Sequence, residues 1–231
     1  MRVLFISTGD AKYGAPKSMM ALMKLLKEKY EVECVLLTKR HNELNEECNR
    51  LGIDNYSMFY ADIMAGSSYE KTYINVIKHM VKYGLYLFGN ISKKNIDKLG
   101  IDFSKIDIIH SNTNRVDIGA YIFERYNIPH VWHLREMDEG TKGMCYYKKK
   151  WQSYMNSHVS KYIAITNVVK ESWKDKGLDA NKISVIYNGI DERNVKVSNR
   201  KNEYKLKIVS VGRIEKSKGQ EELVRDRKSV V

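Results

Sequence analysis

The sequence predicts an α/β fold: one complete doubly wound parallel sheet with flanking helices, followed by the first strand, loop and helix of a second sheet of this kind. Two observations carry the prediction. Between residues 2 and 187, short β-rich runs alternate with longer segments of helical periodicity, which is the pattern of βαβ units. Further on, residues 206–211 form another apolar run, and residues 220–224 start another helix after a loop that contains glycine.

Six strands and five helices are predicted for the first sheet. The strands are expected at residues 2–6, 33–38, 107–110, 130–134, 162–165 and 184–187. The helices are expected at residues 15–29, 69–98, 116–126, 146–157 and 168–176. Pro16 suits the first turn of the first helix, because its missing N–H would have no partner there.

The long helix at residues 69–98 carries apolar side chains near helical spacing. The stripe consists of Ile74, Ile77, Val81, Leu85 and Phe88. Such a stripe either packs on the sheet or faces a membrane, and core packing is the commoner role. We therefore expect the stripe to be buried.

The domain boundaries follow from changes in composition. Residues 1–193 are expected to form the first domain, residues 194–204 a polar and basic interdomain linker, and residues 205–225 the start of a second domain. Residues 226–231 continue no pattern. They can be written as the codons GAT CGG AAG AGC GTC GTG, the start of a common sequencing adapter, so we expect this tail to be non-native.

Composition restricts the environment and the partners. The chain has three widely spaced cysteines, no apolar run long enough to span a bilayer and no signal peptide, so we expect a cytoplasmic protein without a disulfide framework. The formal charge of +12 fits a lysine-rich solvated surface, an anionic membrane or an acidic substrate. Lys148, Lys149 and Lys150 precede Trp151, and we place this basic patch on a helix surface, with peripheral membrane contact as the alternative. Nucleic acid is not an expected partner, because no nucleic-acid-binding motif is found.

Candidate site residues lie beyond the carboxyl ends of the predicted strands, where ligands bind in doubly wound sheets. They are Gly14, Ala15, Ser111, Asn112, His133, Arg135, Glu136, Asn188, Arg213 and Lys218. The first loop is no P-loop, since Lys17 arrives two residues late and Pro16 removes an N–H donor. A glycine loop entering a helix N-terminus remains, which suits an anion or sugar hydroxyls, and Gly14 would let a ligand approach the backbone.

His133 ends the fourth strand beside Arg135 and Glu136. A histidine at this point is either a hydrogen-bonded scaffold residue or a cleft residue, and both readings stay open. His130 and His133 have no third ligand within reach in the sequence, so no metal is expected. Arg213 and Lys218 place two cations next to the start of a helix, an arrangement suited to a diphosphate.

Together these segments resemble glycosyltransferase family 4, a family of retaining enzymes with the GT-B fold. The resemblance covers nearly the whole chain up to Val224 and rests on five motifs in the family's order. The motifs are the Gly14-Ala15 loop, Ile109-His110-Ser111, His133-Leu134-Arg135-Glu136, Ile186-Tyr187-Asn188-Gly189-Ile190-Asp191, and Val211-Gly212-Arg213 with Lys218-Gly219. It implies an acceptor-side Rossmann-like domain followed by the start of a nucleotide-sugar-binding domain.

The resemblance also implies a reaction. The parent would be a hexosyltransferase-type enzyme that moves a sugar from a nucleotide-diphosphate donor to a saccharide or lipid-linked acceptor in cell-envelope or exopolysaccharide synthesis, without metal or cofactor. Arg213 and Lys218 match the pair that grips the diphosphate, His133 matches the cleft histidine that contacts the donor sugar, and Gly14 with Ala15 matches the loop near phosphate and acceptor. Where the family usually has a second glycine, Ala15-Pro16-Lys17 follow, which leaves acceptor handling open.

The family's paired donor-binding glutamates belong to the second domain, beyond Val231, so we expect the chain by itself to be inactive. A sugar-nucleotide epimerase of similar two-domain architecture and a non-catalytic sugar-nucleotide-binding subunit remain alternatives. A second domain with paired glutamates would favour sugar transfer.

Overall fold

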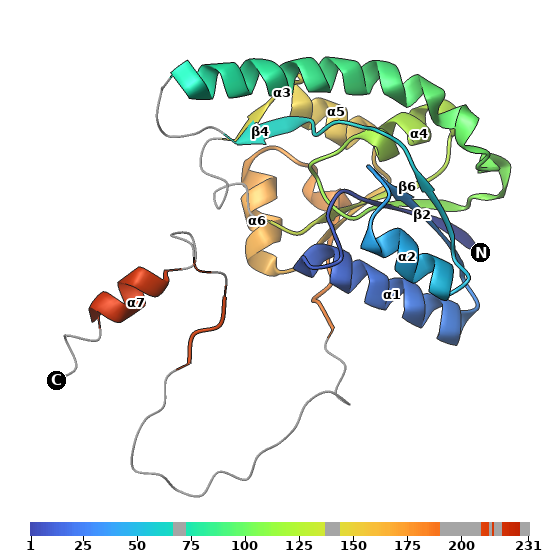
Figure 1. Ribbon diagram of the computed structural model, residues 1–231, viewed down its shortest axis with the longest axis horizontal. Helices are drawn as coiled ribbons and strands as arrows, with labels where there is room; N and C mark the ends of the chain where they lie inside the picture. Colours follow the sequence, from blue (N-terminus) through green and yellow to red (C-terminus); the bar gives the residue numbers. More distant parts are fainter. Residues whose placement is uncertain (67–72, 137–143, 190–208, 213, 215–218, 227–231) are drawn as a thin grey trace, which may run out of the picture. The chain divides into compact units, whose positions relative to one another are not determined.

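A seven-stranded parallel sheet forms the centre of the protein in the computed structural model, which describes residues 1–66, 73–136, 144–189, 209–212, 214 and 219–226 (Figure 1). The strands are β1 (Arg2–Ser7), β2 (Glu33–Thr38), β3 (Asp54–Ser57), β5 (Ile108–Ser111), β6 (His130–Leu134), β8 (Lys161–Ala164) and β9 (Ile183–Val185). Their order across the sheet is β3-β2-β1-β5-β6-β8-β9, and every neighbouring pair is parallel. The predicted parallel sheet is confirmed.

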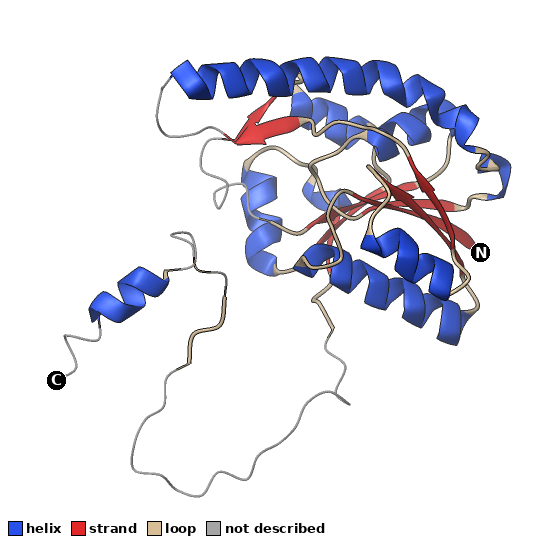
Figure 2. Ribbon diagram, viewed as in Figure 1, coloured by secondary structure: helices blue, strands red, loops and turns tan. Residues whose placement is uncertain are grey.

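Helices cover both faces of this sheet (Figures 1 and 2). On one face lie α1 (Gly14–Tyr30) and α2 (Glu43–Arg50), and on the other lie α3 (Tyr73–Ser92), α4 (Ile118–Tyr126) and α5 (Trp151–Ser157). The helix α6 (Asn167–Asp175) connects β8 to β9, and short 3-10 helices occupy Lys93–Leu99 (η1), Phe103–Lys105 (η2) and Ala180–Lys182 (η4). A separate antiparallel pair is formed by β4 (Met64–Gly66) and β7 (Met144–Tyr146).

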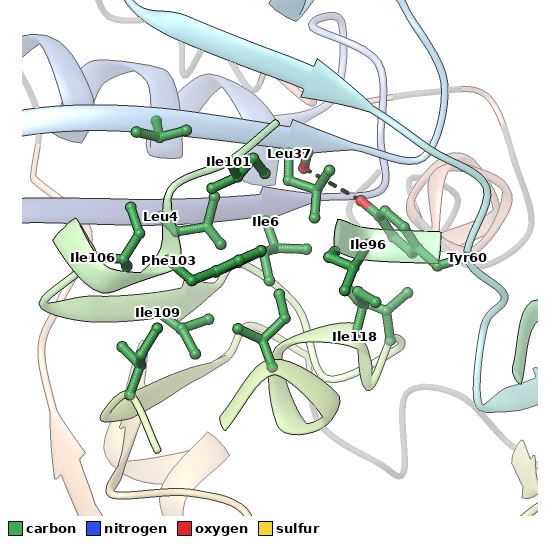
Figure 3. Close-up of a cluster of buried hydrophobic side chains, with 14 residues drawn as sticks. Leu4, Ile6, Leu37, Tyr60, Ile96, Ile101, Phe103, Ile106, Ile109 and Ile118 are labelled. Atoms are coloured by element: carbon green, nitrogen blue, oxygen red, sulfur yellow. Dashed lines mark hydrogen bonds between the residues drawn. The ribbon is translucent and has the colours of Figure 1, made fainter. Parts of the chain in front are cut away.

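The central strand β1 is apolar from Val3 to Ile6 because both of its faces are buried. In β1, Val3 and Phe5 pack towards the α1 side, whereas Leu4 and Ile6 join the opposite cluster with Ile109 (Figure 3). This period-two alternation fills two separate cores from one strand. Tyr60 closes the second core, and its buried hydroxyl donates to the carbonyl oxygens of Ser7 at 2.7 Å and Leu37 at 3.3 Å.

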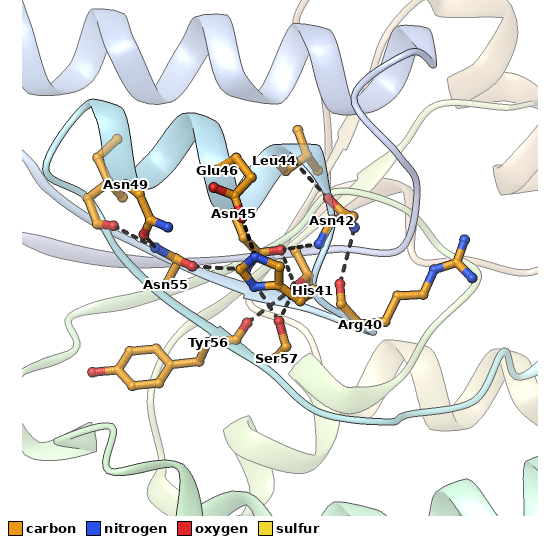
Figure 4. A network of polar contacts seen from close by, with 12 residues as sticks. Arg40, His41, Asn42, Leu44, Asn45, Glu46, Asn49, Asn55, Tyr56 and Ser57 are labelled. Atoms are coloured by element: carbon orange, nitrogen blue, oxygen red, sulfur yellow. Dashed lines mark hydrogen bonds and ion pairs between the residues drawn. The ribbon is translucent and has the colours of Figure 1, made fainter.

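Two elements that sequence patterns missed, α2 and β3, are short and polar. The helix α2 has few apolar residues, and its start is fixed by Asn42, whose side chain accepts a hydrogen bond from the backbone N–H of Leu44 at 2.8 Å. Asn45 then links this helix to the sheet, accepting from the Thr38 hydroxyl at 3.0 Å and donating to Asn55 of β3 at 3.0 Å (Figure 4). Side-chain hydrogen bonds therefore build a part of the fold in which hydrophobic periodicity is weak.

The prediction that the stripe on the long helix is buried was wrong. Ile74, Ile77, Val81, Leu85 and Phe88 are each between 48% and 63% exposed on α3. Packing at the C-terminal part of the helix uses a different face. There Gly89 lies so close to Ala61 that an added Cβ would be 2.5 Å from the Ala61 Cβ, and Tyr86 is 7% exposed. The side with small and polar residues therefore faces the protein, and the aliphatic side faces outward.

The helix predicted at residues 146–157 is shorter than expected. Tyr146 belongs to β7, and α5 begins only at Trp151. The backbone of Lys150 is left-handed, with φ of 54°, so the helix does not extend further towards the N-terminus. The prediction that Lys148, Lys149 and Lys150 lie on a helix surface is therefore corrected: they occupy the turn between β7 and α5.

Two compact units divide the chain, Met1–Gly189 and Ile190–Val231. In the second unit, α7 (Gln220–Asp226) matches the predicted helix. Residues 209–211 are described and form no strand, which corrects that part of the predicted strand; no described backbone group pairs with them to make a ladder. The expected linker at 194–204, Arg213, Lys218 and residues 227–231 of the expected tail lie outside the described residues.

Candidate active site

The sheet order reverses between β1 and β5, and this reversal defines the expected ligand position. From β1 the chain builds outward through β2 to β3, and from β5 it builds in the other direction through β6, β8 and β9. Ligands of doubly wound sheets bind beyond the carboxyl ends of the strands at such a reversal. Here the two adjoining loops are joined directly, because the Asn112 side-chain amide donates to the carbonyl oxygen of Ala15 at 3.1 Å.

Arg135 connects this junction to the far end of the sheet. Its Nε donates to the Asn112 Oδ1 at 2.9 Å and to the Asn112 carbonyl oxygen at 3.2 Å, and its Nη1 donates to the Asn188 Oδ1 at 3.3 Å. The hydroxyl of Ser18, in α1, donates to the same Asn188 oxygen at 3.3 Å. Four residues singled out from the sequence, Ala15, Asn112, Arg135 and Asn188, therefore form one hydrogen-bonded network.

The Arg135 guanidinium is a partly desolvated cation. Burial lowers its pKa to about 10, and the group stays charged at neutral pH. Within the part of the chain that the structure describes, its hydrogen-bond partners are neutral oxygens and none is a carboxylate. The half-buried guanidinium and the N-terminal turn of α1 lie close together, and both favour the binding of an anionic group next to them.

His133 and His110 form a stacked pair beside Arg135. The His133 Nδ1 and the His110 Nε2 are 3.3 Å apart, and the ring centroids are separated by 5.4 Å. Burial, with a further contribution from the Arg135 charge, lowers the pKa of each histidine to about 3. Both rings are therefore neutral at physiological pH. The His133 Nε2 is buried and has no partner among the described residues, so it is the ring atom that remains for a ligand.

The remaining candidates take different positions. Ser111 is fully buried, and its hydroxyl bonds to the His130 Nε2 at 2.8 Å, so its side chain points into the protein. The side chain of Glu136 is exposed, while its carbonyl oxygen accepts from the indole of Trp173 at 2.8 Å. Gly14 begins α1 with open space around it, since an added Cβ would meet nothing within 4 Å. The fold therefore does not require a glycine at position 14.

Two residues of the cluster, His110 and Ser18, were not among the candidates. A signal for His110 was present, because His110 and His133 are each the last residue but one of their strands, β5 and β6. Equivalent positions on neighbouring parallel strands bring side chains together on one face of the sheet. For Ser18 we find no sequence signal, because its partner Asn188 is distant in the chain.

The fold and this polar cluster define a Rossmann-like domain of the GT-B type. The family model of glycosyltransferase family 4 matches residues 14–194, and the chain belongs to this family. No curated protein sequence matches the chain significantly.

Solved structures agree on the fold. The chain is similar to Anabaena Alr3699/HepE in complex with UDP and glucose, with 16% identity, a TM-score of 0.57, and coverage of 86% of this chain and 47% of that one. It is also similar to a glycosyltransferase from Rickettsia africae ESF-5, with 17% identity, a TM-score of 0.51, and coverage of 84% and 46%. The chain therefore spans about half the length of these proteins.

Proposed function

We propose that this chain is the acceptor-side half of a retaining glycosyltransferase that moves a hexose from a nucleotide-diphosphate donor to a saccharide or lipid-linked acceptor. The observation that carries the proposal is the cluster at the sheet reversal, where the His133 Nε2 and the Arg135 guanidinium lie together in a family 4 domain. A UDP-type donor is supported by Alr3699/HepE, whose structure was determined with UDP and glucose. A role in cell-envelope or exopolysaccharide synthesis, in the cytoplasm, belongs to the same proposal.

In this proposal the protein supplies charge and position. The bond between the anomeric carbon and the diphosphate oxygen breaks, the acceptor oxygen bonds to that carbon, and the acceptor proton passes to the departing diphosphate. Arg213 and Lys218 stabilise the departing diphosphate, so the reaction needs no metal or cofactor. The Nε2 of His133 contacts the donor sugar near its reacting face, and His110 holds the ring in place from behind.

Gly14, Ala15 and the amides of Asn112 and Asn188 border the acceptor in this proposal. The open space at Gly14 leaves room for a ligand close to the helix backbone. Glu136, which has an exposed side chain, follows Arg135 directly after β6. The charge of Arg135 attracts an anionic part of either substrate.

The experiment compares the 231-residue chain with a longer protein that continues through a second domain. Each is incubated with a panel of nucleotide sugars and a lipid extract, and nucleotide release and acceptor products are followed by chromatography and mass spectrometry. We expect turnover by the longer protein only, with the anomeric configuration retained in the product. His133→Ala should lower kcat/KM by at least about 100-fold, the range for loss of a positioned active-site group.

A matched control is His41→Ala, because His41 is an exposed histidine that pairs with Glu46 away from the cluster. Its kcat/KM should stay at the wild-type value. Conversion of the nucleotide sugar into an epimer without transfer would overturn the proposal in favour of the epimerase. Tight binding of nucleotide sugar without any turnover by the longer protein would favour the binding subunit. Turnover by the 231-residue chain alone would contradict the division of the site between two halves.

A further inference from the structure

The outer side of α3 is an exposed apolar surface, which we call the α3 face. Figure 1 shows α3 as the outermost helix of its layer, lying beyond α4 and α5. Every large apolar side chain of the α3 face is at least 47% exposed. These residues are Tyr73, Ile74, Val76, Ile77, Met80, Val81, Tyr83, Leu85, Leu87, Phe88 and Ile91. Contiguous apolar surface of this extent marks an interaction site.

The α3 face cannot turn inward, because the opposite side of the helix is fixed. Gly89 is in close contact with Ala61, and the hydroxyl of Ser92 donates to the carbonyl oxygen of Phe59 at 2.8 Å. Directly after the helix, the Lys93 ammonium is buried in an ion pair with Asp117. Rotation of the helix would break these contacts, so the apolar side chains belong to a permanent outer surface.

Positive charge borders the α3 face. From Tyr73 to Ser92 the helix contains Lys78 and Lys82, both exposed, and no aspartate or glutamate. At 100° per residue, Lys78 falls at the edge between the exposed and the buried sides of the helix, whereas Lys82 falls between Gly89 and Tyr86 on the opposite side. Lysines on the flank of an apolar stripe keep their ammonium groups in the headgroup layer when the stripe enters a bilayer.

A second group of lysines lies next to the helix. The ring of Tyr147 is 5.5 Å from that of Tyr83 and 5.0 Å from that of Tyr86, so the turn that follows β7 is held against α3. Lys149 and Lys150 in this turn are exposed. Two carboxylates act on Lys148 of this turn: Asp117, which is buried and paired with Lys93, and Glu124, which lies 3.5 Å from His158. The α3 face is therefore apolar in the middle and net cationic at its border.

We propose that the α3 face docks the protein on the surface of an anionic lipid bilayer. A second copy of the chain is a poor occupant, because two such helices would bring like-charged lysines together without carboxylates on either helix to pair with them. In the described part of the chain no helix is long and apolar enough to cross a membrane, so the attachment is interfacial. The docking does not depend on the proposed transfer reaction; if both hold, the acceptor is a lipid-linked saccharide.

The test is co-sedimentation of the 231-residue chain with vesicles. One set contains equal parts of phosphatidylglycerol and phosphatidylcholine, and the other contains phosphatidylcholine alone, each at low and at high salt. We expect strong binding to the anionic vesicles at low salt, weaker binding at high salt, and weak binding to the neutral vesicles. Removing Lys78 and Lys149 together (Lys78→Gln/Lys149→Gln) should weaken binding about 25-fold, from about fivefold per lysine near an anionic surface.

Three apolar substitutions separate docking from simple charge attraction. Ile77→Gln/Met80→Gln/Val81→Gln keeps the charge and should lower binding at least tenfold, because apolar area no longer enters the bilayer. The matched control, Leu25→Gln/Tyr30→Gln on α1, removes exposed apolar side chains elsewhere and should bind like the wild type. Circular dichroism and thermal melting should show that all variants are folded, since the substituted side chains are exposed.

Several results would overturn the proposal. One is the absence of binding to anionic vesicles at low salt, and another is binding that the apolar triple substitution leaves unchanged. A third is a dimer in light scattering that the triple substitution dissociates, because such a dimer would assign the α3 face to a second copy of the chain. A longer protein that continues through a second domain, but has lost vesicle binding, would assign the α3 face to that domain.

Discussion

Replacement of Lys93 by methionine should destabilise the protein strongly. The Lys93 and Asp117 side chains are 6% and 1% exposed, so the ion pair is shielded from water. Methionine has a similar length but carries no charge, and among the described residues the Asp117 carboxylate would keep only the Tyr154 hydroxyl, at 3.3 Å. Breaking one side of a buried pair costs about 3–5 kcal/mol, because the remaining charge stays without its partner. We expect Lys93→Met to lower the free energy of unfolding by this amount.

Urea denaturation followed by circular dichroism measures this loss. The double variant Lys93→Met/Asp117→Leu should recover most of the stability, since replacing both ions by apolar groups is close to neutral. Lys174→Met is a matched control: the pair of Lys174 with Glu171 at 2.7 Å is exposed, and its loss should be close to zero. A loss below about 1 kcal/mol for Lys93→Met, or a double variant less stable than the single one, would refute the reasoning.

Two further predictions concern the buried histidines and the glycines. Burial lowers the pKa of His110, His130 and His133 to about 3, 4 and 3, so the unfolded chain binds more protons below its own pKa of about 6.5. The contribution of these histidines to the free energy of unfolding should be complete above pH 6.5 and should fall at lower pH, by up to about 2 kcal/mol per histidine at pH 5. Thermal melting at a series of pH values measures this loss. If the melting temperature of His130→Gln changes with pH as steeply as that of the wild type, the prediction is contradicted. Gly119→Ala should lower the free energy of unfolding by about 1–3 kcal/mol, because the new Cβ would lie 2.2 Å from the Ser111 hydroxyl oxygen. Gly84 has open space around it, so Gly84→Ala should raise the free energy of unfolding by about 0.5–1 kcal/mol. Equal melting temperatures for the two variants would disprove the packing argument.

The predicted elements were most accurate where burial is two-sided. β2 and β6 were predicted with their observed bounds, and β1 and α1 were correct to within one residue at each end, because apolar runs and helical stripes there reflect real core contacts. β3 and α2 were missed because Asn42, Asn45 and Asn55 hold them with side-chain hydrogen bonds, which leave no hydrophobic period. The orientation of α3 was wrong for a related reason: periodicity identifies an apolar stripe and does not show whether protein covers it.

The candidate site was predicted in part. The rule that ligands bind beyond strand ends selected Asn112, Arg135 and Asn188, and the structure joins these three residues by hydrogen bonds. That rule did not separate Ser111, which points inward, from Asn112, its neighbour in the chain. Successive side chains along a strand point to opposite faces of the sheet. Which side chain reaches the carboxyl edge of the sheet therefore depends on the residue at which the strand ends.

Asn188 lies one residue before the end of the first compact unit, and Arg135 and Ser18 both donate to its side-chain oxygen. An anion that competes for the guanidinium of Arg135 would therefore loosen the anchorage of the main chain where it leaves this unit. By thermodynamic reciprocity, a pull on the departing segment would alter the affinity for that anion to the same degree. Anion binding at Arg135 and the anchorage of the main chain after Asn188 are therefore linked through the side-chain amide of Asn188.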